Sequence, residues 1–173
     1  DVLRSKNFYY ACVSFVDYQV GRIIAALKEK GMYDDTLILF SSDHGDMMGD
    51  YNAIGKRTMV DSSCHVPLMI HVPGHGHERR QDPCSLVDIA PTLLRYVGAP
   101  YDPREFDGVD LFAPSERTYV YSQHGCGSGG TYMITDGRDK LVYSAARDKY
   151  YFFDQIPEMR SIYDAEHPKI QEM

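Results

Sequence analysis

The chain has 173 residues, of which 43% are hydrophobic and 12% are aromatic. This is enough apolar material to build the core of one domain, so intrinsic disorder is excluded as the main description. The 18 Lys and Arg residues stand against 25 Asp and Glu residues, which gives a net charge of −7. The positive charges are not clustered, so nucleic acid is not an expected partner, and no apolar run is long enough to predict a membrane span.

Two helices are predicted in the first hundred residues. Apolar residues recur every three or four positions within residues 8–30, the spacing that places them on one helical face. Gly31 follows as the expected C-terminal cap of this helix. The same spacing returns in residues 86–97, with Pro91 in the first turn of the predicted helix and Gly98 at its end.

Two strands are predicted between these helices. Residues 36–40 form a continuous apolar run, which is typical of a strand buried on both faces. Residues 66–72 form a second such run, and Pro73 and Gly74 end it. Helices that alternate with buried strands indicate an α/β layer.

The pattern changes after residues 99–114, a segment rich in Pro, Asp and Gly that indicates a boundary. Beyond it, short segments rich in Tyr, Val, Ile and Phe predict a small antiparallel sheet. Its strands are expected at residues 118–123, 131–135, 140–144 and 150–154. A short helix is expected within residues 164–173. We therefore divide the chain into an α/β region, 1–100, and a C-terminal subdomain, 101–173.

Polar chemistry begins where the first predicted strand ends. Asp43 and His44 follow that strand directly, and in open α/β sheets ligands bind at the loops that leave the carboxyl ends of strands. A carboxylate and an imidazole together suit a divalent cation. The alternative is that Asp43 caps a turn and His44 is a surface histidine, because two ligands alone do not define a metal site.

Two further residues are candidates for binding an anion. Lys56 would present a compact positive charge to an anionic substrate group, unless it is a solvated surface lysine. His65 precedes the second strand and could donate to the same anion or act as a general acid, or be a core histidine. The histidines at 71, 75 and 77 are not assigned to a metal cluster, because the last two lie in a polar loop away from Asp43.

Taken in order, these segments resemble the C-terminal half of a sulfatase, in the alkaline-phosphatase-like superfamily. The resemblance extends over nearly the whole chain, and the ordered series is specific to that family. The matching segments are residues 10–27, 35–46, 55–56, 65–68, 72–74, 86–94 and 151–158. His44 stands where the family more often places Asn, which is similar to phosphonate monoester hydrolases and choline-sulfatases.

The resemblance implies hydrolysis of a sulfate ester by a formylglycine nucleophile, with a divalent cation held by four side chains. Asp43 and His44 match two of these metal ligands, with calcium expected and manganese or zinc as alternatives. Lys56 matches the lysine that contacts the sulfate, where it would be both catalytic and substrate-binding. His65 receives the same two roles, although many relatives carry Arg at its position. The implied fold is α/β: part of an alkaline-phosphatase-like sandwich, with helices around a mainly parallel sheet, followed by a small antiparallel sheet.

Two parts of the family pattern have no counterpart in the sequence. One is the Cys/Ser-x-Pro-x-Arg motif that supplies formylglycine, and the other is the family's first Asp-Asp metal pair. We therefore expect the chain alone to be catalytically silent, with the missing N-terminal half or another chain as partner, or a second copy of itself. The alternatives are a phosphonate or phosphodiester hydrolase, or a binding module that retains the fold. The sequence does not choose between cytoplasm and periplasm.

Overall fold

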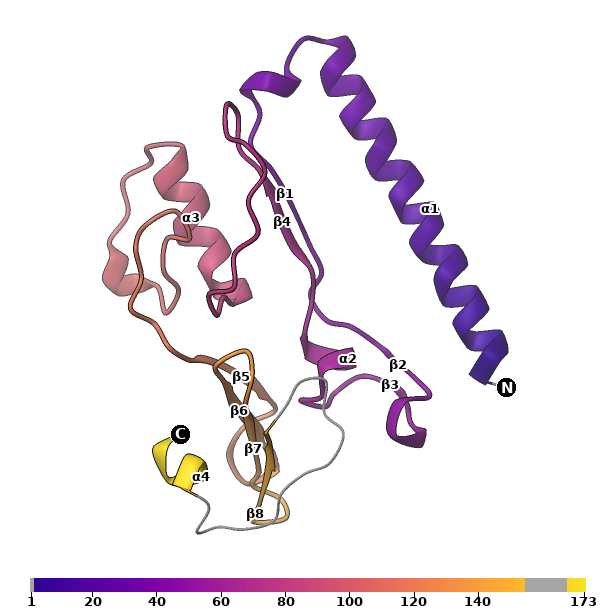
Figure 1. The fold of residues 1–173 in the computed structure, drawn as a ribbon, viewed down its shortest axis with the longest axis vertical. Coiled ribbons are helices and arrows are strands. Elements are labelled where there is room, and N and C mark those ends of the chain that lie inside the picture. The colour runs from indigo at the N-terminus through magenta and orange to yellow at the C-terminus, as the bar shows by residue number, and fades with distance from the viewer. Residues whose placement is uncertain (1, 155–167) are drawn as a thin grey trace. The chain divides into compact units, whose positions relative to one another are not determined.

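The computed structural model describes residues 2–154 and 168–173 (Figure 1). The chain forms two compact units. The first comprises Asp1–Lys56 and Ser62–Arg79, and the second comprises Arg57–Asp61 and Arg80–Met173. This grouping differs from the predicted regions 1–100 and 101–173, because residues 109–117 donate hydrogen bonds to Asp88 and Thr92. The functional division at residue 100 stays a prediction.

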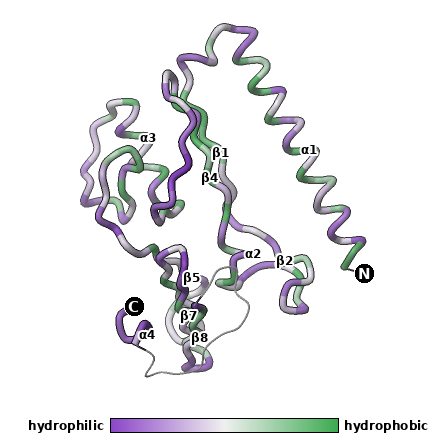
Figure 2. The backbone as a smooth tube through the Cα atoms, viewed as in Figure 1, coloured by the Kyte–Doolittle hydropathy of each residue, from purple (hydrophilic) through white to green (hydrophobic). Residues whose placement is uncertain are grey.

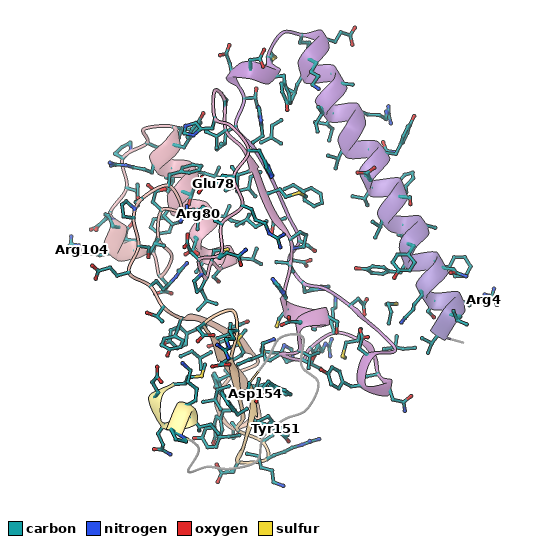
Figure 3. All side chains as sticks on the ribbon, in the orientation of Figure 1. Arg4, Glu78, Arg80, Arg104, Tyr151 and Asp154 are labelled. Atoms are coloured by element: carbon teal, nitrogen blue, oxygen red, sulfur yellow. The ribbon has the colours of Figure 1, made fainter. Side chains whose placement is uncertain are left out.

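The first unit opens with helix α1, Val2–Glu29, which begins earlier than the predicted range 8–30. Its end is the predicted one. Gly31 has a φ of +64°, its N–H donates to the Lys28 carbonyl at 3.0 Å, and the Met32 N–H donates to the Leu27 carbonyl at 2.9 Å. This is the Schellman arrangement, in which a left-handed residue satisfies the last carbonyls. None of the helix's residues is buried, and side chains project from it on all sides (Figure 3).

A glycine in the middle of α1 gives a stability prediction. Gly21 is exposed, and a Cβ built on it would meet nothing within 4 Å. Gly21→Ala is expected to stabilise the helix by about 0.5–1 kcal/mol, because alanine loses less backbone entropy there. Thermal unfolding followed by circular dichroism at 222 nm measures the change. Gly31→Ala is the control, and its left-handed φ should make the same substitution destabilising; equal shifts in the two variants would contradict the prediction.

The two predicted strands of the first unit are present, but they run antiparallel. Strands β1, Ile38–Ser41, and β4, Leu68–His71, pair with Ile38 opposite His71 and Ser41 opposite Leu68. The mainly parallel sheet is therefore not seen among the described residues. Parallel neighbours need a crossover that returns the chain to its starting end. Here the connecting segment enters β4 beside the end of β1, so the chain runs back.

Each strand has three apolar residues and ends in a polar one, Ser41 or His71, and the green stretch at β1 in Figure 2 marks part of this apolar surface, yet none of their residues is buried. The expectation of burial on both faces is not met in this chain, because the pair forms a sheet of only two strands. Four short elements lie in the connection between them. Strands β2, Met47–Met48, and β3, Ile54–Gly55, pair antiparallel around a 3-10 turn, Asp50–Asn52, and helix α2, Asp61–Cys64, follows.

In the second unit, helix α3 spans Ile89–Tyr96 after a single 3-10 turn, Leu86–Asp88. Ser85 and Asp88 form a capping box in which the Ser85 N–H donates to the Asp88 carboxylate at 2.7 Å. The helix ends as predicted at Gly98, whose φ is +68°. A further 3-10 turn, Pro103–Glu105, follows in the Pro-rich segment.

The predicted C-terminal antiparallel sheet is confirmed. Its strands lie in sequence order, and each pairs antiparallel with the next. They are β5, Val120–His124; β6, Thr131–Thr135; β7, Lys140–Ser144; and β8, Lys149–Phe153. Helix α4, Pro168–Glu172, contributes Ile170 to the cluster around Ile134, Leu141 and Phe152. The α/β class with a small antiparallel sheet is thus confirmed.

Two predictions reach beyond what is described. The family-like closing segment, 151–158, and the start of the expected terminal helix, 164–173, lie partly outside the described residues. Within residues 2–154 and 168–173, no helix combines the length and the apolar character that a membrane crossing requires.

Candidate functional site

The loop that leaves β1 is held by hydrogen bonds between its own side chains and backbone. The Ser42 hydroxyl donates to the His44 carbonyl at 2.9 Å, and the His44 N–H donates to Asp43 Oδ1 at 2.9 Å. The latter bond is the main reason that the pKa of Asp43 lies below its ordinary value, and the positive charge of Lys56 also lowers it. Asp43 is therefore a carboxylate at neutral pH. Its side chain is 83% exposed, so the oxygens are accessible.

Gly45 seats this loop against the backbone of helix α2. Its N–H donates to the Ser63 carbonyl at 2.8 Å, and a Cβ at this position would lie 2.2 Å from the Ser62 carbonyl oxygen. Ser63 is buried, at 3% exposure. The absence of a side chain at position 45 thus lets the loop approach the chain's own backbone.

The imidazole of His44 is oriented by its own loop. Nδ1 lies 2.8 Å from the Gly45 carbonyl oxygen, which can only accept, so Nδ1 carries the proton. Nε2 then has a lone pair, and it lies 2.6 Å from Lys56 Nζ and 3.4 Å from Asp43 Oδ2. A histidine whose Nδ1–H is bound to a backbone carbonyl is in the tautomer that binds metals through Nε2.

Lys56 reaches this loop because the ribbon of β2 and β3 turns the chain back. Met47 pairs with Gly55, the residue before Lys56, so the lysine returns to the position of His44. The structure thus brings together Asp43, His44 and Lys56. His65 is exposed on the segment between α2 and β4. Its place in the same site stays a prediction.

The donor atoms of Asp43 and His44 fit part of the coordination sphere of a divalent cation. Calcium binds oxygen at about 2.3–2.6 Å, so two donors at right angles around it lie about 3.3–3.7 Å apart. The separation of Asp43 Oδ2 and His44 Nε2 is 3.4 Å. Within the described residues no three His, Cys, Asp or Glu side chains gather to hold a metal ion. Asp43 and His44 by themselves therefore do not complete a metal site.

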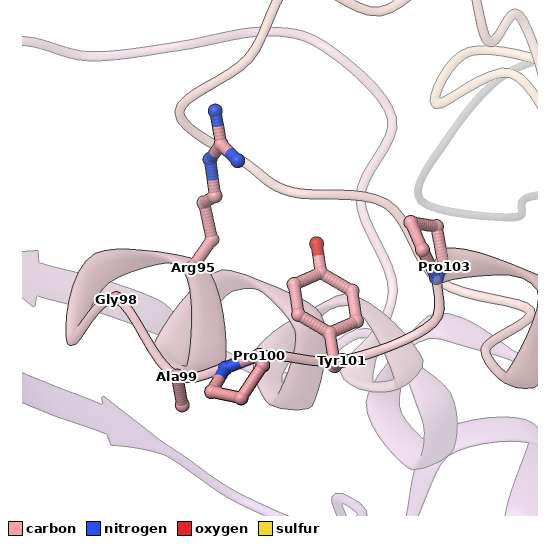
Figure 4. A pocket seen from close by; sticks show the side chains of 6 residues that line it. All are labelled: Arg95, Gly98, Ala99, Pro100, Tyr101 and Pro103. Atoms are coloured by element: carbon pink, nitrogen blue, oxygen red, sulfur yellow. The ribbon is translucent and has the colours of Figure 1, made fainter.

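Two hollows on the described surface are lined by residues other than these three. A cavity of about 210 Å³ is lined by Lys6, Tyr9 and Tyr10 of α1 and by Asp46, Met48 and Asp50. Asp46 has no predicted role, and its Oδ1 is buried without a hydrogen-bond partner in the described part of the chain. A more open hollow of about 420 Å³ lies between Arg95 and Pro103 in the second unit (Figure 4). Neither hollow contains Asp43, His44 or Lys56, which lie on an open loop.

Comparison with known proteins places these residues within a matched segment. The family model described as Sulfatase matches residues 3–99. An arylsulfatase of Clostridium perfringens is 33% identical over 162 residues, which covers 87% of this chain and 34% of that protein. A choline-sulfatase of Rhizobium meliloti is 43% identical over 98 residues, which covers 57% of this chain and 19% of that protein.

Solved structures extend the likeness to the fold. A phosphonate monoester hydrolase from Silicibacter pomeroyi is 34% identical, with a TM-score of 0.73, and the match covers 91% of this chain and 36% of that one. The chain therefore spans about a third of the length of the arylsulfatase and of the hydrolase that it matches.

Proposed function

The chain belongs to the sulfatase family, and we propose that it supplies two metal ligands and an anion-binding lysine to an enzyme that hydrolyses sulfate esters. Members of this family bind a divalent metal. The arylsulfatase and choline-sulfatase relatives are named for sulfate-ester substrates, which favours sulfuryl over phosphonyl transfer. The observation that carries the proposal is the approach of Lys56 Nζ to 2.6 Å from His44 Nε2, beside Asp43.

Asp43 and His44 would hold the cation through a carboxylate oxygen and Nε2. Calcium is the proposed ion, because Asp43 provides a hard, ionised and exposed oxygen donor. A cation bound there would withdraw negative charge from a sulfate oxygen. The Gly45 carbonyl fixes the His44 tautomer whose Nε2 lone pair would bind the ion.

Lys56 would bind the sulfate group itself. Its ammonium carries three donors and a full charge, and its exposed position beside the metal ligands lets it reach a bound anion. A fixed positive charge stabilises the negative charge that develops during transfer. His65 is proposed as a second sulfate contact. The formylglycine nucleophile and the remaining ligands would come from the part of the family fold that this chain does not span.

Turnover by the native protein tests this proposal. The protein would be isolated from its host through an antibody to this chain and assayed on an aryl sulfate and an aryl phosphonate monoester. We expect the sulfate to be the better substrate, and Lys56→Ala to lower kcat/KM about 100- to 1000-fold, the cost of removing one charge-stabilising donor. Lys30→Ala, at another exposed lysine of the first unit, is the matched control.

The outcomes separate the alternatives. Faster hydrolysis of the phosphonate would show that the reaction class is wrong. Absence of turnover, with a calcium affinity that Asp43→Asn weakens at least tenfold, would identify a binding module that retains the fold. The isolated 173-residue chain is expected to bind the cation but to leave the aryl sulfate intact, because its sequence lacks the Cys/Ser-x-Pro-x-Arg motif.

A further inference from the structure

The single lone pair of His44 is already occupied by a side chain of the same unit. Because Nδ1 carries the imidazole proton toward the Gly45 carbonyl, Nε2 can only accept, and it accepts from Lys56 Nζ at 2.6 Å. Nε2 has one lone pair in the plane of the ring. A cation bound through that lone pair and an ammonium donating to it exclude each other.

We propose that Lys56 occupies the metal-binding lone pair of His44 in the metal-free chain and leaves it when a cation binds, which frees its ammonium for the substrate anion. This inference rests on the proposed function, since it takes Asp43 and His44 as metal ligands. It adds that the Lys56 ammonium binds either His44 Nε2 or the substrate anion. The cation and the anion therefore do not bind independently.

The geometry allows the exchange. Lys56 is exposed and ends a flexible four-carbon stem, so the ammonium can move without rearranging the ribbon of β2 and β3. Asp43 and His44 stay where the loop's own hydrogen bonds and the Gly45 contact hold them. The moving part is therefore one side chain, and the ligand pair is in place before the ion arrives.

The coupling between the two ligands follows from this exchange. Without a cation, an anion must separate Lys56 from His44 before it can use the ammonium. With a cation bound, that separation has already been made. By linkage, an anion that binds Lys56 must raise the affinity for the cation by the same factor as the cation raises the affinity for the anion.

The test follows both side chains directly by NMR in the 173-residue chain. With ¹⁵N-labelled Lys and His, the Lys56 ammonium should give a signal protected from exchange, and His44 should show the Nδ1–H tautomer. Saturating Ca²⁺, or Zn²⁺ as a second diamagnetic probe, should abolish the protection of the Lys56 signal. Lys30, exposed in the same unit, is the internal control and should not change.

Calorimetry supplies the second readout. Lys56→Met should bind Ca²⁺ about tenfold more tightly than the original chain, whereas Lys30→Met should not. Asp43→Asn should lose cation binding while its Lys56 signal stays protected. Together these results would support the exchange.

Contrary results would distinguish failure of the Lys56 exchange from failure of the proposed metal ligands. If Ca²⁺ binds through Asp43 while the Lys56 signal stays protected, the exchange is overturned and the proposed metal ligands stand. The exchange would also be overturned if Lys56→Met binds Ca²⁺ more tightly but Ca²⁺ leaves the Lys56 signal of the original chain protected. Removal of a repelling positive charge would then explain the tighter binding. If neither the original chain nor Lys56→Met binds the cation, the proposed metal ligands fail, and the inference fails with them.

Discussion

Replacing Arg117 with methionine should cost the second unit about 3–5 kcal/mol, because it leaves a buried carboxylate without its charged partner. Arg117 donates to both oxygens of Asp88, from Nη1 at 2.8 Å and from Nη2 at 2.5 Å. The Asp88 side chain is 0% exposed, and Val109 donates a backbone N–H to it as well. The pair thus joins the start of α3 to the segment that leads into the C-terminal sheet.

Hydrogen exchange of the Val109 and Leu111 amides measures this loss where it occurs. Val109 donates to Asp88, and Leu111 donates to the Thr92 hydroxyl, so both amides report opening of the network. Arg104→Met is the matched control. Arg104 forms a comparable pair with Asp102, but its side chain is 89% exposed, and solvent screens such a pair. Equal protection in both variants would refute the assignment of a structural role to Arg117.

The same network predicts the pH dependence of the effect. Burial by itself raises the pKa of Asp88, but hydrogen bonds from Arg117, Val109 and Ser85 outweigh it and hold the pKa below its ordinary value. Because its pKa is lowered in the folded chain, ionised Asp88 stabilises the fold at pH values above its pKa in the unfolded chain, about 3.9. This stabilisation is lost as the pH falls through the pKa of Asp88 in the folded chain. In Arg117→Met, protonation removes the unpaired buried charge of Asp88 and so stabilises the folded chain. The difference in free energy of unfolding between the original chain and Arg117→Met should therefore become smaller below about pH 4.

Local signals in the sequence were sufficient for much of the fold. The two helix ends at Gly31 and Gly98 follow from the left-handed conformation that glycine adopts readily. Strands β6 and β7 begin and end at the predicted residues, because Asp136 and Gly137 build the turn between them. In each case the residues that decide the structure lie within a few positions of one another.

Long-range features were not predictable in this way. A continuous apolar run identifies a strand but carries no information on its partner, so the antiparallel pairing of β1 and β4 was missed. Arg117 lies in a polar segment, and only the fold brings it to Asp88 across 29 positions. Lys140 is likewise 1% exposed and paired with Asp61 at 2.5 Å, although its sequence neighbourhood resembles an ordinary strand end.

The candidate site shows the same limit. Asp43 and His44 are candidates from the sequence because polar residues after an apolar strand are typical of ligand sites. That Lys56 lies at His44 Nε2 depends on the β2 and β3 ribbon, two strands too short to leave a pattern in the sequence. The need for glycine at position 45 depends on the backbone of Ser62, which no feature of residues 41–46 reveals.

Gly45→Ala should therefore weaken the proposed cation binding at Asp43 and His44 about 10- to 100-fold, the range seen when groups that orient metal ligands are changed. The added Cβ would lie 2.2 Å from the Ser62 carbonyl oxygen, and a backbone atom cannot swing aside as a side chain can. Either the loop or α2 must shift, and the Gly45 N–H bond to Ser63 at 2.8 Å is then lost. Because Gly45 carries the carbonyl that orients His44, the displacement reaches the imidazole directly.

Gly76→Ala is the control for this substitution, since Gly76 is exposed and a Cβ there meets nothing within 4 Å. Calcium titrations of the two variants, with ¹⁵N-His spectra to follow the His44 tautomer, separate a displaced ligand from general loss of structure. Gly45 has no left-handed φ, so alanine fits its backbone conformation and only the contact with Ser62 opposes the methyl group. An unchanged calcium affinity in Gly45→Ala would mean that α2 shifts without moving His44. The contact between Gly45 and Ser62 would then not hold the Asp43–His44 loop in place.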